Sequence, residues 1–453
     1  MRAAKVLVWC SLCACAEQPE ALPSVSNQAA FFCGTRDAPA TRDKWAHFPE
    51  RVPFTDTDIT WRVERYTGDL DARTVDGILA AAFAPWSTAS TLDFRQVAPT
   101  QPADIRIRFD HPGEELPEFD KLDDDTLGIG DSALHTVLFN DDVDWSQPTH
   151  DLQSVALHEL GHVLGLAHSD EGNAVMTTSL RDNSEKRALH REDELAINVL
   201  YGDWQPLRGL ATDVAASGSR GNPVLWVTSG ANTVWRFDFV TERFMQVPGD
   251  GVAISVGNTG LPWVVSSDDS LWEAVTPDGV WWPRGSAKDV AVGSLNGGGT
   301  AIWILSTRST GDGNYVLQKL QGDAFVDSDE SGVRVAVDPL GRVYVVKRDG
   351  AIWRRGRRDN NVSGGWESLP GCASDIGVGT DGDIWVVDCR LDANGNGPVW
   401  VWNEQSVTAM VSDPPFRRGF VPVAAAAKRI AGGPDGKPFA VDAQGGVWRR
   451  VAR

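Results

Sequence analysis

Four residues in an eleven-residue stretch could together hold a metal ion and activate water. His158 and His162 stand four positions apart, so a helix would place both imidazoles on one face, about one turn from each other. Glu159 lies beside them and could take a proton from a metal-bound water. Gly165 would let the chain turn out of the helix without a Cβ clash, bringing His168 round as a third nitrogen ligand. Three neutral imidazoles and one open position are what a catalytic zinc requires.

This stretch has the form H-E-x-x-H-x-x-G-x-x-H, and it resembles the signature of the metzincin clan of zinc peptidases. The clan has a Met-turn beneath the metal, and Met176 is the candidate, one of only four methionines in the chain. Ser169, directly after the third histidine, resembles the matrixin (matrix metalloproteinase) branch. The resemblance implies a zinc endopeptidase with one catalytic zinc on His158, His162 and His168, Glu159 as general base and Met176 in a structural role.

One departure from the matrixin pattern concerns the substrate pocket. Thr177 and Thr178 follow the methionine, where matrixins usually have Pro and Tyr. Those two residues shape the family's pocket for the residue after the cleaved bond. The difference leaves the zinc chemistry unchanged, but it removes the basis for assigning the family's pocket preference to this chain.

Length, composition and charge set limits on the rest of the molecule. A chain of 453 residues with 42% apolar content predicts more than one globular domain. A net charge of −20 argues against a nucleic acid or an anionic membrane as partner.

The first sixteen residues, 1–16, resemble a signal peptide. Arg2 and Lys5 precede a short apolar run that is too short to span a bilayer. Ala14–Ala16 fits an A-x-A cleavage site, whereas Leu12–Cys15 resembles a lipobox in which Cys15 carries a lipid anchor. Both interpretations predict export, either into the medium or to the cell surface, and no other stretch is expected to be transmembrane.

Residues 17–55 are expected to form a short pro-segment or linker. Within it, Cys33-Gly34-Thr35-Arg36-Asp37 resembles a degraded form of the matrixin cysteine switch, whose thiolate binds the catalytic zinc. Arg36 stands in place of the family's Pro, and the segment is far shorter than the family's prodomain. Cys33 is therefore either an inhibitory zinc ligand or a structural or disulfide cysteine.

Residues 56–204 are expected to form the catalytic domain. The alternating and helical patterns predict strands at 59–63, 92–97 and 103–109 and a helix at 71–86, with the zinc helix beginning near Asp151. Residues 136–145 resemble the last strand of the matrixin domain and the acidic loop after it, and residues 190–202 resemble its closing helix. This order resembles the whole matrixin catalytic domain.

Further metal sites are less well marked. Matrixins hold a second, structural zinc before the zinc helix, but here the loop is short and Leu138 replaces an expected His. We expect that zinc to be lost. Its only candidate remnants are Asp110, His111, Asp131 and His135. The runs Asp123–Asp125 and Asn140–Asp142 either hold calcium through hard oxygen ligands or are solvated loops.

Residues 205–453 lose the helical pattern and become rich in Trp, Gly and Val. An apolar run, a Gly turn, a second apolar run with an aromatic residue and a further aromatic residue recur about six times, roughly every 40 residues. The units begin near Val214, Ile254, Val290, Val335, Ile376 and Ile430. The spacing resembles tectonin-type β-propellers. The predicted architecture is therefore multidomain: an α+β metzincin catalytic domain followed by an all-β propeller of about six blades.

Most of the repeated aromatic residues are expected to pack between blades. Cys372 and Cys389 lie in one unit and are candidates for a disulfide. The propeller is expected to bind a surface glycan or a protein, without assignable ligand residues.

Together these features predict a secreted or surface-anchored zinc endopeptidase that cleaves extracellular proteins, with the propeller as a targeting module. The alternative is a glycan- or protein-binding propeller protein with a vestigial protease domain. The intact Glu159 argues against that alternative, because an inactive relative need not keep the base.

Overall fold

The computed structural model describes residues 31–34, 54–112, 126–166, 168–169, 172–177, 179–180, 185–295, 299–356, 365–402 and 420–452. The chain divides into two compact units, largely on either side of the Gly202–Asp203 bond. The predicted signal peptide at 1–16, most of the segment 17–55 and the acidic run Asp123–Asp125 lie outside the described residues. In the described part, no helix is both long and apolar enough to cross a bilayer.

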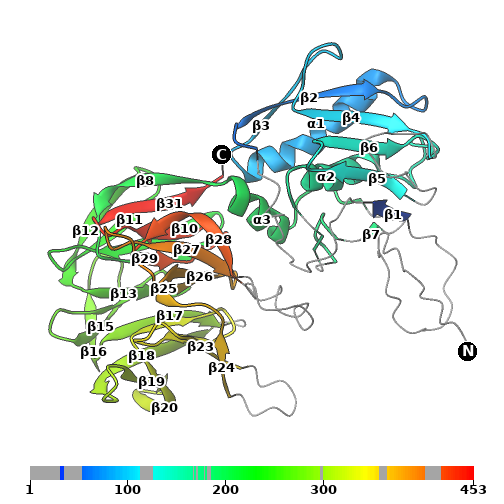
Figure 1. Cartoon of the computed structure of the whole chain (residues 1–453). Helices are drawn as coiled ribbons and strands as arrows, with labels where there is room; N and C mark the ends of the chain where they lie inside the picture. The colour runs from blue at the N-terminus through cyan, green and yellow to red at the C-terminus, as the bar shows by residue number, and fades with distance from the viewer. Residues whose placement is uncertain are drawn as a thin grey trace, which may run out of the picture. The chain divides into compact units, whose positions relative to one another are not determined.

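The first unit is built on a seven-stranded sheet with the order β3-β2-β4-β6-β5-β1-β7 (Figure 1). Its strands are β1 (Phe31–Gly34), β2 (Asp58–Arg65), β3 (Asp93–Gln96), β4 (Ile105–Asp110), β5 (Thr126–Asp131), β6 (Thr136–Asn140) and β7 (Ser179–Leu180). β3, β2, β4 and β6 run parallel, and β5 runs antiparallel to β6. β1 pairs in parallel with the other side of β5, and β7 pairs antiparallel with β1.

Helix α1 (Ala72–Ala89) covers the buried face of this sheet. It begins at Asp71, whose carboxylate accepts a hydrogen bond from the Thr74 N–H at 3.0 Å. Its apolar stripe packs on the alternate side chains of β2, and Phe83 stacks on Trp61 with ring centroids 5.1 Å apart. The buried residues shared by α1, β2 and β4 are Val75, Leu79, Phe83, Trp86, Ile59, Trp61, Val63, Ile105, Ile107 and Phe109.

Two further helices, α2 (Leu152–Val163) and α3 (Arg191–Tyr201), complete the first unit. α2 packs beside α1 and against β5. The Tyr201 hydroxyl at the end of α3 donates to the Leu164 carbonyl at 2.9 Å and accepts from the Phe54 N–H at 3.2 Å. The closing helix therefore secures the chain just beyond α2, where the predicted third ligand follows.

The second unit consists of six four-stranded sheets arranged as blades (Figure 1). The first three blades contain β9 (Asp213–Ser219), β10 (Asn222–Thr228), β11 (Thr233–Asp238) and β12 (Arg243–Asp250); β13 (Ala253–Val256), β14 (Pro262–Val265), β15 (Ser270–Ala274) and β16 (Trp281–Ser286); and β17 (Asp289–Leu295), β18 (Gly299–Ser309), β19 (Tyr315–Gln321) and β20 (Ala324–Gly332). The others contain β21 (Arg334–Val337), β22 (Val343–Val346), β23 (Ile352–Arg355) and β24 (Trp366–Leu369); β25 (Ala373–Val378), β26 (Ile384–Asp388), β27 (Gly397–Trp402) and β28 (Val421–Ala427); and β29 (Arg429–Ala431), β30 (Phe439–Val441), β31 (Gly446–Val451) and β8 (Asp203–Leu210). The innermost strands contact one another in turn around a closed ring. The predicted architecture, an α+β unit followed by a propeller of six blades, is confirmed.

The sixth blade closes the ring by joining the two ends of the second unit. β8 forms its outer strand, paired antiparallel with β31 from Asp203 opposite Val451 to Leu210 opposite Gly446. α3 ends at Tyr201, so Gly202 alone separates the closing helix of the first unit from the closing strand of the second. The boundary expected from sequence, between residues 204 and 205, falls inside this strand.

A network of buried charges links the innermost strands. The Arg334 guanidinium on β21 pairs with Asp375 on β25, with Asp289 on β17 at 3.1 Å and with Asp213 on β9 at 3.3 Å. The second oxygen of each carboxylate accepts a backbone N–H from the next blade, at 2.8–3.0 Å. Burial raises the pKa of Asp289 to about 6, against the opposing effect of Arg334. Burial opposes the charge of Arg334, yet the three carboxylates raise its pKa well above the usual range.

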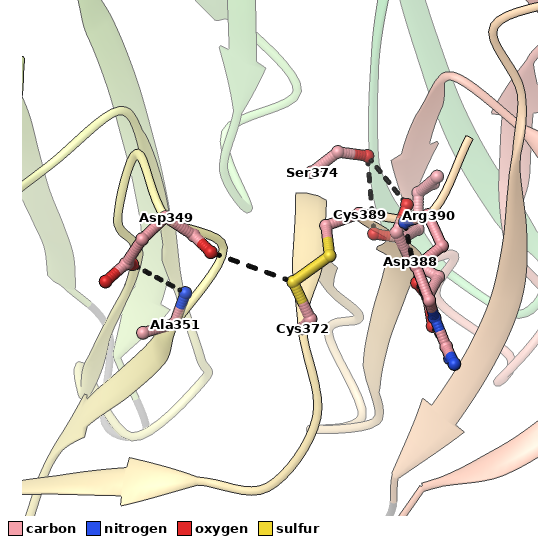
Figure 2. Close-up of a disulfide and its surroundings, with 8 residues drawn as sticks. Asp349, Ala351, Cys372, Ser374, Asp388, Cys389 and Arg390 are labelled. Carbon is pink, nitrogen blue, oxygen red and sulfur yellow. Dashed lines mark hydrogen bonds and ion pairs between the residues drawn. A yellow bond between two sulfur atoms is a disulfide. The ribbon is translucent and has the colours of Figure 1, made fainter.

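Cys372 and Cys389 form a disulfide in the fifth blade (Figure 2). The bond joins the residue before β25 to the residue after β26, across a sequence separation of 17. Cys372 Sγ also lies 3.8 Å from the Asp349 carbonyl oxygen, in the turn that precedes β23 of the fourth blade. Gly350 in that turn has φ +88°, and a Cβ there would collide with Cys372 Sγ. The disulfide therefore packs where the fourth and fifth blades meet.

Replacing Arg334 tests how much this network stabilises the propeller. Arg334→Met would remove the cation that three buried carboxylates share, while Arg429 stays beside Asp213 and Asp375 at 3.5 Å and 3.8 Å. We expect the free energy of unfolding to fall by about 3 kcal/mol. Urea unfolding of the full chain, followed by tryptophan fluorescence, reports mainly on the propeller because 14 of the 19 tryptophans lie beyond residue 202. Arg308→Met is the matched control, since Arg308 and its partner Asp327 are both more than half exposed. Equal losses of stability in the two variants would contradict the prediction.

Candidate metal centre

The zinc-motif histidines lie on α2 and on the turn that follows it. The Asp151 carboxylate caps the helix by accepting the Ser154 N–H at 3.0 Å. The helix ends in a Schellman turn, in which the Gly165 N–H donates to His162 O and the Leu166 N–H donates to Gly161 O, both at 2.9 Å. Gly165 has φ +94°, the left-handed conformation that this turn requires. The turn reverses the chain and returns His168 to the face that carries His158 and His162.

The three imidazoles converge on one point. His162 Nε2 lies 3.0 Å from His158 Nε2 and 3.3 Å from His168 Nε2. A tetrahedral zinc with Zn–N bonds of about 2.0–2.1 Å would separate its ligand nitrogens by about 3.3 Å. Among the described residues, this is the one group of three His, Cys, Asp or Glu side chains close enough to share a metal ion. The predicted ligands are therefore brought together with spacing that fits zinc.

The other ring nitrogens fix how these imidazoles are oriented. His158 Nδ1 donates to the Val175 carbonyl at 2.7 Å, and His162 Nδ1 donates to the Leu166 carbonyl at 2.8 Å. Each bond leaves the Nε2 lone pair directed at the shared point. Burial, followed by the charge of His168, lowers the pKa of His158 to about 3 and that of His162 well below its usual range. Both rings are therefore neutral, the form that binds a metal.

Met176 lies beneath this helix, as expected for a Met-turn. It is 2% exposed, and its sulfur lies so close to Gly161 that a Cβ on Gly161 would collide with it. The Trp86 ring fills the adjacent space, and its Nε1–H donates to the Leu157 carbonyl at 2.9 Å. Gly161, a variable position in the zinc motif, is therefore constrained by the packing of Met176 and Trp86.

The Met-turn is held from α3 by a buried carboxylate. Asp193 accepts the backbone N–H of Val175 at 2.8 Å and that of Met176 at 3.1 Å. A third bond, from the His190 N–H at 2.9 Å, forms part of the N-terminal cap of α3. Burial raises the pKa of Asp193, although these N–H groups oppose the rise. Asp193 thus fixes the carbonyl that orients His158.

Glu159 is part of the zinc-motif helix, and its side chain lies against β5. Its side chain is fully buried, and a Cβ on Gly128 of β5 would come within 3.1 Å of Glu159 Cγ. Gly130, two residues further along β5, is even more restricted, because a Cβ there would strike the Glu159 carbonyl and lie 2.9 Å from His162 Cβ. Sequence patterns did not predict β5, although it lies directly against the site. The alternating glycines Gly128 and Gly130 were the feature in the sequence that could have indicated a close approach of this segment to another element.

The segment that carries Cys33 lies at the same edge of the sheet. β1 pairs in parallel with β5, with Phe32 opposite Thr126 and Gly34 opposite Ile129, and β7 pairs with the other side of β1. β7 follows the Met-turn in sequence. The backbone at Cys33 therefore lies between β7 and β5, and β5 is the strand that contacts Glu159 and His162.

The residues considered for further metals are engaged in other interactions. His111 Nδ1 bonds to Asp142 at 2.7 Å, and the ring of His135 packs against Phe54 with centroids 4.3 Å apart. In the Asn140–Asp142 loop, Asn140 Oδ1 accepts the Asp142 N–H, and Asn140 Nδ2 donates to the Thr126 carbonyl, both at 2.9 Å. These contacts occupy Asn140, while the calcium expectation for this loop stays a prediction.

Comparison with known families agrees with this geometry. Residues 53–202 match the family model described as Matrixin, and residues 214–390 match that of the Tectonin domain. Residues 53–202 form a matrixin domain. The homologues of this domain are zinc metalloendopeptidases, and the three-histidine cluster fits their metal.

Several known proteins are similar to a part of this chain. The chain is 35% identical over 170 residues to an interstitial collagenase from Bos taurus, which covers 35% of the chain and 34% of the relative. It is 30% identical over 193 residues to matrix metalloproteinase-C from Caenorhabditis elegans, covering 38% of the chain and 32% of the relative. Metalloendoproteinase 1-MMP from Arabidopsis thaliana is 32% identical over 185 residues, 37% of the chain and 50% of the relative. The chain thus spans about a third to a half of the length of these relatives.

Replacing Asp193 tests the support of the Met-turn. Asp193→Asn offers one acceptor oxygen in place of two, so at least one buried N–H of the Met-turn would lose its partner. We expect the matrixin domain to lose about 1–3 kcal/mol of stability. We also expect about tenfold weaker zinc binding, measured by competition with a chelator. Glu185→Gln is the control, because Glu185 is an exposed carboxylate near α3. Unchanged stability and zinc affinity in the Asp193 variant would contradict this role.

Proposed function

We propose that the matrixin domain makes this protein a zinc-dependent endopeptidase that hydrolyses peptide bonds in extracellular proteins. The observation that carries the proposal is the convergence of three Nε2 atoms, with His162 3.0 Å and 3.3 Å from its two neighbours. His158, His162 and His168 would hold the metal as neutral imidazoles, which leaves one tetrahedral position open for water or substrate.

Glu159 acts as the general base in this proposal. The chemistry that zinc supplies when bound is polarisation of the scissile carbonyl and a lowered pKa of the bound water. Glu159 accepts the proton of that water and passes it to the leaving amine. Its complete burial beside Gly128 supports this role, because a carboxylate shielded from bulk solvent exchanges its proton with the bound reactants. Met176 and Asp193 take no part in the chemistry and keep the ligands in place.

The remaining parts of the chain determine where the enzyme acts. The segment 1–16 exports the protein, which is then either released or anchored through a lipid on Cys15. The propeller binds a surface glycan or a protein and so holds the peptidase near its substrate. The alternative, a binding protein with a vestigial protease domain, predicts a propeller ligand without proteolysis.

Replacing Glu159 distinguishes these functions. Purified protein spanning 17–453 and its Glu159→Ala variant are both expected to hold one zinc ion, because all three histidines remain. Casein cleavage is expected to fall by roughly 10²–10⁴-fold in the variant, since the carboxylate that takes the proton is removed. Zinc content is measured by elemental analysis, and cleavage by release of labelled peptide. If neither protein holds zinc, the proposal fails and the propeller becomes the functional part.

We also propose that Cys33 is an inhibitory ligand of the zinc. Two observations support it: β1 brings the Cys33 backbone to the β5 edge, and the Cys372–Cys389 disulfide leaves Cys33 as the remaining cysteine beyond residue 16. A thiolate at the fourth position would displace the water and keep the enzyme latent.

The Cys33 proposal predicts higher activity in Cys33→Ser than in the parent at equal zinc content, because serine is a poor zinc ligand. The measurement is the rate of casein cleavage by the zinc-loaded proteins. Glu159→Ala in the Cys33→Ser background serves as the control for contaminating proteases. Equal activity of parent and Cys33→Ser would assign Cys33 a structural role instead.

A further inference from the structure

The segment Ala174–Met176 has six backbone N–H and C=O groups, and hydrogen bonds are described for five of them. The N–H groups of Val175 and Met176 bond to Asp193, as described above. The Val175 carbonyl accepts from His158 Nδ1, and the Met176 carbonyl accepts from the Ser169 N–H at 2.6 Å. The remaining carbonyl, that of Ala174, accepts from the ammonium group of Lys186 at 2.7 Å.

Lys186 binds a second carbonyl on the approach to the same turn. Its Nζ donates to the Gly172 carbonyl, also at 2.7 Å. Hydrogen bonds from an ammonium to carbonyls are shorter and stronger than bonds between neutral groups. The two bonds therefore draw the carbonyls of Gly172 and Ala174 onto one cation, and this fixes the path of the chain into the Met-turn.

The backbone of Lys186 is tied to the beginning of the zinc-motif helix. Its N–H donates to Ser154 Oγ at 2.7 Å, and Ser154 is the residue whose own N–H bonds to the capping carboxylate of Asp151. Lys186 therefore joins the N-terminus of α2 to the Met-turn that packs beneath the same helix. The turn is held by an anion, Asp193, at two of its N–H groups and by a cation, Lys186, at the Ala174 carbonyl, which also accepts the Thr177 N–H at 3.4 Å.

We infer that Lys186 is a positioning residue for the metal centre: it holds the Met-turn so that the Val175 carbonyl keeps His158 aimed at the zinc. Val175 lies directly after Ala174, so a shift of the Ala174 peptide moves the acceptor of the 2.7 Å bond from His158 Nδ1. Lys186 touches neither zinc nor substrate and acts through the backbone alone. The inference rests on the proposed zinc site, and it assigns a role that the zinc motif itself does not contain.

The test compares zinc affinity and kinetics in three variants. Lys186→Met keeps the length of the side chain and removes the charge, and Lys186→Arg restores a cation. Arg95→Met is the control, because Arg95 is an exposed cation on β3, at the edge of the sheet opposite β1 and β7. Each protein is measured for zinc dissociation by chelator competition, for kcat and KM on a labelled peptide, and for thermal unfolding of the zinc-free form.

We expect Lys186→Met to weaken zinc binding about 10- to 100-fold and to lower kcat with little change in KM, since the metal ligands and not the substrate contacts are disturbed. Lys186→Arg is expected to recover a large part of both losses, whereas Arg95→Met behaves like the parent. Lys186→Gln, which keeps a donor, replaces the Met variant if that variant does not fold.

Three results would overturn the inference. Parental zinc affinity and kcat in Lys186→Met would make Lys186 a surface tether only. A loss of stability in the zinc-free protein, with unchanged zinc affinity, would make its role purely structural. A parent that binds no zinc overturns both the inference and the proposed function. If the parent and its Cys33→Ser variant both bind zinc but cleave nothing, the proposed peptidase function fails while the zinc-affinity comparison still decides the role of Lys186.

Discussion

The hydrogen bond from His158 Nδ1 to the Val175 carbonyl is the contact on which the rest of the metal centre depends. A histidine ligand needs its second nitrogen bound, because that bond fixes both the tautomer and the plane of the ring. His162 obtains this bond locally, from the Leu166 carbonyl in the turn that ends its own helix. His158 obtains it from a separate segment, so its orientation depends on tertiary structure. Asp193 on one side of that segment and Lys186 on the other are the groups that hold the acceptor in place.

A second constraint is how closely other elements approach the zinc-motif helix. Gly130 lets the backbone of β5 contact the Glu159 carbonyl, and Gly161 lets Met176 contact the helix from below. A methyl group at Gly130 would collide with the backbone of Glu159 and press on His162, and a methyl group at Gly161 would collide with the Met176 sulfur. The helix is therefore enclosed between β5 and the Met-turn, and the complete burial of His158 and Glu159 follows from that enclosure. The same burial keeps the imidazole of His158 neutral, since it lowers the pKa of that residue to about 3.

Periodic features could be predicted from sequence, and features made by distant residues could not. The spacing of His158, His162 and His168 gave the metal cluster, and six recurring apolar units gave the blades, because both signals are local and repeat. β5 escaped prediction because Gly128 and Gly130 disfavour a strand, and only the position of α2 explains them. Lys186 lies in a polar stretch without a motif. Its role depends on the fold, which brings the carbonyl oxygens of Gly172 and Ala174 each to 2.7 Å from Lys186 Nζ. Likewise, the charges that Arg334 gathers lie on strands of different blades, so no local pattern could link them.

The connection between the two units is a single residue, Gly202, because the strand that closes the propeller, β8, begins at Asp203. Asp203 pairs with Val451, so the propeller closes by joining the residues that are farthest apart within it. The entropy lost in closing a loop grows only with the logarithm of its length, so this pairing adds little to the entropy already lost when six blades pack. It also pairs one edge of β31 with one edge of β8, and both edges would otherwise be exposed. Since Gly202 alone lies between the end of α3 and the start of β8, a cut that separates the matrixin domain beyond Leu210 would take the closing strand with it and reopen the sixth blade. A cut at Gly202 instead leaves the closing helix with the first unit and the closing strand with the second.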